Sequence, residues 1–190
     1  METAVLVRRA AGGDMDSYEA LVRLYQGVIF RMVYYRVLSR MDAEDITQDV
    51  FLQAMKSVKN LRDPERFNAW LYRIALNRIR DFLRKKKLLN LFRVESGRVG
   101  EEGDIPVAER IGDLERKDFW RHMNEFLADL SHREREVFRL RFLDHLGIRE
   151  IAEVIQKNES TVKTCLYRSV KKFKDAHELQ DVLDGIRRKS

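Results

Sequence analysis

The chain has 190 residues, 44% hydrophobic and 36% charged, a balance that excludes a disordered protein and allows one domain or two small ones. The net charge is +6 and the pI is near 9.5. This modest excess of basic residues is informative only where the residues cluster along the chain. The single Cys165 excludes an internal disulfide and a cysteine cluster for zinc, and is expected to be a buried or half-buried bystander. Because neither a signal peptide nor a membrane-spanning apolar run is present, we expect a cytoplasmic protein.

The apolar residues follow the helical period nearly everywhere, and only two prolines interrupt the chain, so we predict an all-α fold. The first helix is expected over residues 3–11, ended by a pair of glycines. A second helix is expected to run to about Ser39, with Asp14 or Asp16 as its cap. Its inward-facing residues are predicted to be Tyr18, Leu21, Val22, Tyr25, Ile29, Met32 and Val33.

A third helix is predicted from Ala43 to about Ser57, capped by Asp42. Its packing face is expected to consist of Ile46, Val50, Phe51, Ala54 and Met55. A separate flank, acidic and mostly polar, carries Asp45, Gln48, Asp49 and Leu52. A loop follows over residues 59–65, in which Asp63 is placed to cap and Pro64 to begin the next helix.

The fourth helix, residues 66–87, has two different faces. Its apolar face consists of Phe67, Leu71, Ile74, Ala75, Ile79 and Phe82. Its other face carries Trp70, Arg73, Asn77, Arg80 and Arg84. Between Arg78 and Lys87 there are six basic residues and one acidic residue, which suits a polyphosphate partner. The residues alone are equally compatible with a core Trp70 and a basic end that complements the helix macrodipole.

Residues 88–115 differ in composition from the segments on both sides. They hold four of the nine glycines, one of the two prolines, and seven acidic residues against three basic ones. This composition predicts a flexible acidic linker between two small helical domains, residues 1–87 and 116–190. A single domain with one long loop is the less favoured alternative.

The second domain is predicted to begin with a helix whose apolar stripe is Phe119, Met123, Phe126, Leu127 and Leu130. Ser131 and Glu134 then fit a capping box for a helix that carries Val137, Phe138, Leu140 and Leu143. Two further short helices, residues 148–155 and 159–173, flank a tight polar turn and predict a helix-turn-helix, with Asn158 available as a cap.

The last helix has a narrow predicted core stripe of Val162, Leu166, Val170 and Phe173. Its outward face is then Ser160, Lys163, Thr164, Tyr167, Arg168 and Lys171. Basic side chains can bind guanine edges or phosphates, and hydroxyls can bind either, so this face is typical of a recognition helix. An ordinary helical hairpin with a solvated basic face is the alternative.

Four segments in this order resemble the bacterial sigma factors of the short, two-domain extracytoplasmic-function (ECF) type. DAEDITQDVFLQA (42–54) resembles the family's core-polymerase-binding helix, and FNAWLYRIALNRIRDFLRKKK (67–87) its helix for minus-10 recognition and melting. LSHREREVFRLRF (130–142) and IREIAEVIQKNESTVKTCLYR (148–168) resemble its minus-35 recognition domain. We expect no segment before Met1 and no more than a linker between the domains, and this is what distinguishes the type from larger sigma factors.

The resemblance implies an initiation subunit that binds core RNA polymerase, directs it to promoters and assists melting, with residues 1–87 as sigma region 2 and residues 116–190 as region 4. The residues implied to bind the clamp coiled coil of the polymerase are Asp45, Gln48, Asp49 and Leu52. A solvated acidic face is the alternative for the same flank. The linker resembles segments that pass through the positively charged polymerase channel.

The resemblance also implies contacts with single- and double-stranded promoter DNA. At the minus-10 element they are Asn60, Arg62, Trp70, Tyr72, Arg73, Asn77, Arg80, Arg84 and Lys85. Among these, Tyr72 lies closest to the apolar face of its helix. At the minus-35 element they are Ser160, Lys163, Thr164, Tyr167, Arg168 and Lys171.

The four histidines have no metal-ligand spacing and no catalytic motif is found, so we expect no enzyme activity, cofactor, metal or small-molecule substrate. The resemblance further implies an anti-sigma partner that could hold the protein at the membrane, and association with the nucleoid when active. A stand-alone helix-turn-helix regulator of transcription is the alternative function.

Overall fold

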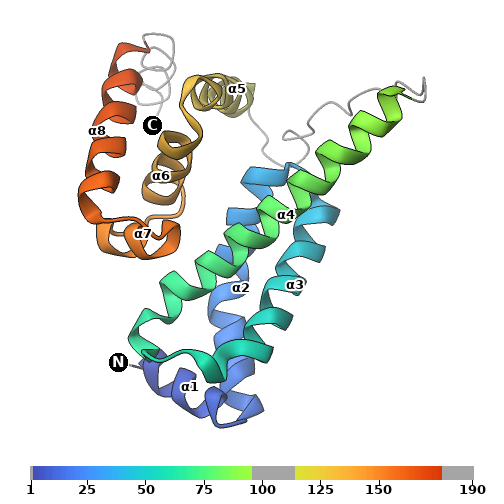
Figure 1. Ribbon diagram of the computed structural model, residues 1–190, viewed down its shortest axis with the longest axis vertical. Coiled ribbons are helices and arrows are strands. Elements are labelled where there is room, and N and C mark those ends of the chain that lie inside the picture. The colour runs from blue at the N-terminus through green and yellow to red at the C-terminus, as the bar shows by residue number, and fades with distance from the viewer. Residues whose placement is uncertain (1, 96–113, 177–190) are drawn as a thin grey trace. The chain divides into compact units, whose positions relative to one another are not determined.

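The computed structural model describes residues 2–95 and 114–176. The contacts divide the chain into two units, Met1–Ile105 and Pro106–Ser190, and each is described by itself. The regular elements of the first unit are α1 (Glu2–Ala11), α2 (Met15–Val37), α3 (Arg40–Ser57), the short 3-10 turns η1 (Val58–Asn60) and η2 (Pro64–Arg66), and α4 (Phe67–Glu95). Those of the second are α5 (Leu114–Asp129), α6 (His132–Phe142), α7 (Ile148–Ile155) and α8 (Glu159–Asp175) (Figure 1). Over these residues the predicted all-α fold is confirmed.

In the first unit, α2 packs against α1, α3 and α4, and α3 also packs against α4. The chain turns from α1 to α2 at Gly13, whose φ of 96° is readily adopted only by glycine. Asp14 then caps α2 by accepting hydrogen bonds from the backbone nitrogens of Asp16, at 3.1 Å, and Ser17, at 3.4 Å. The largest fully buried side chains of this core are Phe67, Leu21, Ile29, Met32, Leu71 and Leu76.

The start of α3 differs from the prediction. Ser39, not Asp42, is its cap: the Ser39 hydroxyl oxygen accepts from the Asp42 backbone nitrogen at 3.3 Å. The reason is that α2 already ends at Leu38, whose φ is 57°. The first turn of α3 therefore begins at Arg40, and Asp42 lies inside that turn. Met55, predicted to pack, is 38% exposed.

The predicted linker is helical at both ends. The helix α4 continues past Lys87 to Glu95, because no glycine or proline occurs before Gly97, and α5 begins at Leu114. The rest of the predicted linker, residues 96–113, lies outside the described residues, as does the side chain of Phe119.

In the second unit, α6 and α8 pack against each other, and α7 packs against both. The predicted capping box is present: Ser131 accepts from the backbone of Glu134, whose carboxylate accepts from the backbone nitrogen of Ser131 at 3.1 Å. The rings of Phe126, Phe138 and Phe173 join α5, α6 and α8, with centroids 5.2 to 5.9 Å apart.

The core stripe of α8 is only partly as predicted. Val162 is fully buried, but Leu166, Val170 and Phe173 are half-buried, and the inward positions include Cys165, 8% exposed, and Ser169, fully buried. Small side chains allow helices to approach closely, so the packing of α8 favours them at these positions.

Candidate functional site

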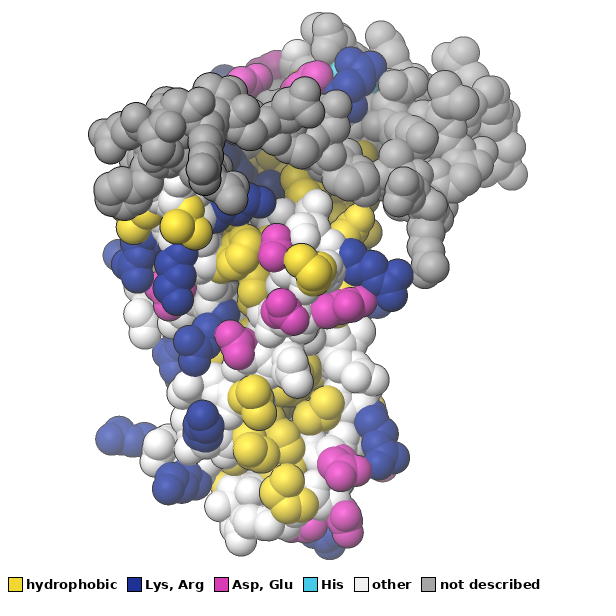
Figure 2. Space-filling model, turned by 90° about the vertical axis from the view of Figure 1, so that its right-hand side faces the viewer, with side chains coloured by type: hydrophobic (Ala, Val, Ile, Leu, Met, Phe, Trp, Pro, Cys, Tyr) yellow, Lys and Arg dark blue, Asp and Glu magenta, His cyan; other side chains and the backbone are white. Residues whose placement is uncertain are grey.

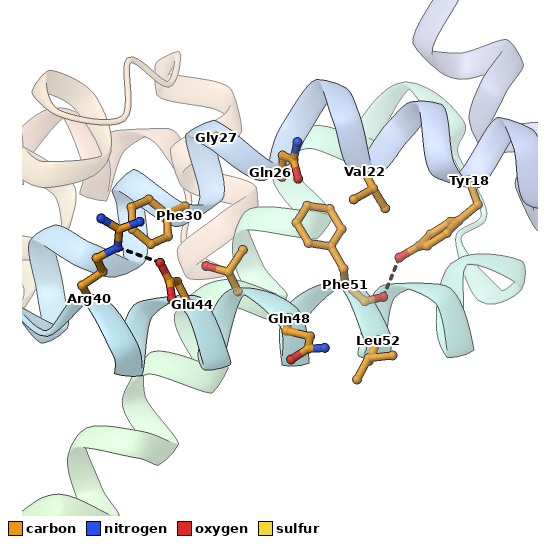
Figure 3. A pocket seen from close by; sticks show the side chains of 11 residues that line it. Tyr18, Val22, Gln26, Gly27, Phe30, Arg40, Glu44, Gln48, Phe51 and Leu52 are labelled. Carbon is orange, nitrogen blue, oxygen red and sulfur yellow. Dashed lines mark hydrogen bonds and ion pairs between the residues drawn. The ribbon is translucent and has the colours of Figure 1, made fainter.

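The predicted docking flank of α3 is open to solvent. Asp45, Gln48 and Asp49 are exposed, and Leu52 is 45% exposed. Gln48 and Leu52 also line a groove of about 630 Å³ between α2 and α3 (Figure 3). Asp45 and Asp49 do not line this groove, but each is three residues from a lining residue, Gln48 or Leu52, and so lies beside it on α3.

Sequence reasoning missed the groove. Its α2 wall is formed by Tyr18, Val22, Gln26 and Phe30, which recur every four residues and thus lie on one side of the helix (Figure 3). That spacing is the available signal, but the predictions from sequence include only Tyr18 and Val22 of the four, and assign them to the core. At one end of the groove the Arg40 Nε pairs with the Glu44 carboxylate at 2.8 Å. Figure 2 shows apolar side chains gathered in bands with acidic ones beside them, on the side of the first unit where α3 lies.

The loop before α4 presents Asn60 and Arg62, which are both exposed. Asp63 caps the next turn as predicted: its carboxylate accepts from the Glu65 backbone nitrogen and from the Arg66 Nε, both at 3.1 Å. Val58, only 3% exposed, anchors the start of the loop. The elements η1 and η2 both pack against α1, so the loop has a defined conformation.

Along α4, the structure separates the predicted residues by exposure. Asn77, Arg80, Arg84 and Lys85 are exposed, while Trp70 and Arg73 are half-buried. The Trp70 ring lies against Phe67 with centroids 5.6 Å apart, so one part of it packs and another reaches solvent.

Two residues of α4 face the protein. Tyr72 is 4% exposed, because it lies on the same side of the helix as the buried Leu76, and its ring cannot stack on a base from there. Arg78 is half-buried, and its Nη2 donates to the Gln53 Oε1 on α3 at 2.9 Å. The outward basic cluster of α4 therefore begins at Arg80.

The predicted recognition face of α8 is exposed at every position: Ser160, Lys163, Thr164, Tyr167, Arg168 and Lys171. Tyr167 is 73% exposed, which is unusual for an aromatic side chain with no role at a surface. Asn158 caps the helix by accepting from the Thr161 backbone nitrogen at 2.8 Å. The Thr164 hydroxyl donates to the Ser160 carbonyl at 2.9 Å and keeps its acceptor capacity.

Cys165 is buried on the opposite side of α8 from this face, and burial raises the pKa of its thiol. It therefore packs as a small apolar residue, as expected from the sequence. Among the described helices, none is both long and apolar enough to cross a membrane.

Residues 21–88 match the family profile described as Sigma-70 region 2, and residues 123–173 match the one described as Sigma-70, region 4. RNA polymerase sigma factor SigV of Bacillus subtilis (strain 168) is 34% identical over 142 residues, which cover 75% of this chain and 80% of that protein. The ECF RNA polymerase sigma-E factor of Haemophilus influenzae is 30% identical over 185 residues, covering 86% and 89%. The chain belongs to the ECF RNA polymerase sigma factors. A stand-alone regulator would not contain region 2, so that alternative is not favoured.

Other similarities of this ECF sigma factor agree. BldN of Streptomyces coelicolor, an ECF sigma factor, is 32% identical over 173 residues, and the chain spans 62% of that longer protein. Two solved structures share the fold. CnrH, in complex with the cytosolic domain of CnrY, has a TM-score of 0.67 at 23% identity, with 97% of this chain and 99% of that one covered. RpoE of Bartonella quintana, in complex with NepR, has a TM-score of 0.63 at 21% identity, covering 88% and 96%.

Proposed function

We propose that this ECF sigma factor binds core RNA polymerase through α3, holds the melted minus-10 strand against α4, and recognises the upstream promoter element through α8. One observation carries the proposal: the side chains predicted for all three tasks are exposed, except for Trp70 and Arg73, which are half-buried, and Tyr72, which is buried. They include acidic side chains where the polymerase would bind, and basic, aromatic or hydrogen-bonding ones where DNA would bind.

The α3 flank and the adjoining groove suit a basic amphipathic helix, such as one from the clamp coiled coil of the polymerase. Asp45 and Asp49 supply negative charge, and Leu52 continues the surface into the apolar groove. Charge complementarity orients the two partners, while burial of the groove supplies affinity. We include Val22 and Phe30 of α2 in this docking surface because they line the same groove.

The face of α4 suits an unpaired DNA strand. Trp70 and Asn77 are two turns apart on one side of the helix, so one can stack on a base while the other hydrogen-bonds to a base edge. Arg73, Arg80, Arg84 and Lys85 supply positive charge for phosphates, and the loop bearing Asn60 and Arg62 suits an extruded base. Stacking contributes about 1 to 3 kcal/mol per base, which can offset an unstacking cost of a few kcal/mol.

The exposed face of α8 suits the major groove of a duplex. Lys163, Arg168 and Lys171 can bind guanine edges or phosphates, while Ser160 and Thr164 can hydrogen-bond to either. The Tyr167 ring offers an apolar surface to a thymine methyl group. These contacts would place the second unit on the minus-35 element.

We further propose that residues 1–87 and 116–190 act as separate promoter-binding domains joined by the acidic segment 88–115. The protein would act in the cytoplasm, on the nucleoid, as a subunit without catalysis or a cofactor of its own. An anti-sigma factor is a proposed partner because the structurally similar CnrH and RpoE are in complex with CnrY and NepR. Such a partner could hold it at the membrane.

Run-off transcription with purified core polymerase tests the proposal. The full chain should direct transcription from a subset of promoter fragments, and permanganate should detect unpaired thymines near minus 10. The free chain alone should bind the same fragments weakly in a gel shift. Tight specific binding without polymerase, together with no transcription, would instead support a stand-alone regulator.

A further inference from the structure

A buried carboxylate lies beside the recognition helix. Glu134, in the first turn of α6, is 7% exposed. Its Oε2 accepts hydrogen bonds from the Ser131 backbone nitrogen at 3.1 Å and from the Lys172 Nζ at 3.0 Å. The first bond belongs to the helix cap, while the second joins α6 to α8 between residues 38 positions apart. Neither Glu134 nor Lys172 belongs to the recognition face.

Lys172 lies at the edge of that face. It follows Arg168 by four residues, so the two side chains lie one turn apart on the same side of α8, about 40° from each other around the helix axis. The Lys172 side chain is 49% exposed, whereas that of Glu134 is 9% exposed. A released Lys172 could therefore turn toward a DNA backbone, while Glu134 could not follow it.

The burial of Glu134 distinguishes this contact from a surface ion pair, because the buried carboxylate would lose a hydrogen-bond donor if Lys172 moved away. A solvent-exposed ion pair contributes little to stability, but a desolvated carboxylate depends on its hydrogen-bond donors. Glu134 receives one donor from the cap of α6 and one from α8, so it adds a polar contact between the two helices to their apolar packing. The rotation of α8 about its own axis decides which of its side chains point outward.

We propose that Glu134 is a specificity-determining residue for the upstream promoter element. It holds Lys172 against α6, which fixes the orientation of α8 and withholds one positive charge from the DNA backbone. A phosphate contact strengthens binding to all sequences alike, because phosphate carries no sequence information. Release of Lys172 would therefore raise specific and non-specific affinity equally and show only in the salt slope, whereas the fixed orientation of α8 determines the ratio of the two affinities. This inference rests on the duplex-binding function proposed for α8.

The test uses the full chain bound to core polymerase and two promoter duplexes, one with the intact upstream element and one with that element scrambled. The ratio of the two affinities removes the contributions of the polymerase and the first unit. Glu134→Gln keeps the shape of the side chain, and glutamine fits the capping box. We expect it to lower the ratio about threefold to tenfold. It should also steepen the slope of log affinity against log salt by about 0.9, one phosphate contact.

Lys172→Met tests the same proposal from the other side of the contact. It remains informative even if Glu134→Gln does not fold. If Glu134 already withholds Lys172 from DNA, the salt slope should not change, while the intact-to-scrambled ratio should fall. A slope that becomes shallower by about 0.9 would show that Lys172 contacts phosphate in the parent protein and would overturn the proposal.

Two further variants separate the possible failures. Glu125→Gln removes an exposed negative charge on α5, and should change neither the ratio nor the slope. If α8 binds the duplex, Arg168→Ala should lower the ratio when Arg168 binds a base edge, or make the salt slope shallower by about 0.9 when it binds a phosphate. An unchanged ratio together with an unchanged slope in Arg168→Ala would refute the duplex-binding function itself. A change in either quantity there, with ratio and slope unchanged in a folded Glu134→Gln, would refute only the role of Glu134.

Discussion

The Tyr18 hydroxyl donates a hydrogen bond to the backbone carbonyl of Phe51, which ties α2 to α3 along the wall of the groove (Figure 3). Tyr18 is 7% exposed, and this burial raises its pKa to about 12. The α2–α3 groove therefore has a hydrogen bond between its two walls, which the neutral phenol donates.

Tyr18→Phe should lower the free energy of unfolding by about 1 kcal/mol, because it removes a buried hydrogen bond. The pH dependence is more specific. The unfolded phenol ionises near pH 10 and the folded one near 12, so the unfolded state binds fewer protons in this range and stability falls as pH rises from 10 to about 12. Denaturation at several pH values should show that the free energy of unfolding of Tyr18→Phe falls less between pH 10 and about 12 than that of the parent. Equal losses in both proteins would contradict this.

Reversing the charge of the α3 flank with Asp45→Lys and Asp49→Lys should weaken binding to core polymerase by more than about tenfold, since both acidic residues are exposed beside the groove. Helicity should not change. Asp16→Lys with Glu19→Lys makes the same change of charge at exposed positions of α2 and is the matched control. Co-purification with core polymerase measures the effect, and undiminished recovery of the α3 variant would refute docking by this flank.

Lys163→Ala should weaken binding to the upstream element in the holoenzyme. If Lys163 binds a base edge, the loss should be about 1 to 3 kcal/mol and confined to one position of the element. If it binds a phosphate, the loss should be similar for all sequences, with a salt slope shallower by about 0.9. Arg121→Ala, an exposed basic residue of α5, is the control. Affinity equal to that of the parent would remove Lys163 from the recognition face.

Asn77→Ala should reduce open-complex formation on a duplex promoter but have little effect on a template already mismatched at minus 10. The mismatch removes the cost of unpairing, which the contact to the free strand would otherwise offset. Trp70→Ala should behave in the same way if its ring stacks on a base. Permanganate footprinting on both templates provides the measurement.

Trp70 also packs on Phe67, so its truncation has a second possible outcome. If the ring serves the core, Trp70→Ala should cost about 3 to 5 kcal/mol of stability and impair both templates equally. A thermal melt of each variant distinguishes the cases. Because Asn77 is exposed, equal impairment by Asn77→Ala on the two templates would argue against a melting role for this face.

The hydrogen bond from Lys172 is the main reason why the pKa of Glu134 is lowered from its usual value of 4.5, with further hydrogen bonds from Ser131. A carboxyl group whose pKa is lower in the folded protein than in the unfolded chain stabilises the fold. This contribution is complete above the pKa of the unfolded chain and is lost as the pH falls through the pKa of the folded protein. The second unit should therefore lose stability below about pH 4.5. Glu134→Gln should be less stable than the parent near neutral pH and should lose less on acidification. Parallel pH profiles would contradict this.

Much of this protein is determined by local sequence. Helix boundaries at Asp14, Asp63, Ser131 and Asn158 follow from side chains that can accept a hydrogen bond from the next turn, which is chemistry within four residues. The recognition face of α8 likewise follows from helical period and residue type, and all of its six residues are exposed. The resemblance of four short segments to the family is likewise sufficient to indicate an ECF sigma factor.

Only the tertiary structure decided which residues near the edge of an apolar face are buried, and what buried polar groups bind. Tyr72 and Arg78 face the protein rather than solvent because of how α4 lies against its neighbours, not because of their residue types. The α2–α3 groove and the Glu134–Lys172 contact join residues far apart in the chain. Helical period fixes the direction of a side chain about its own helix axis, but the distance between two helices depends on the packing of all side chains between them.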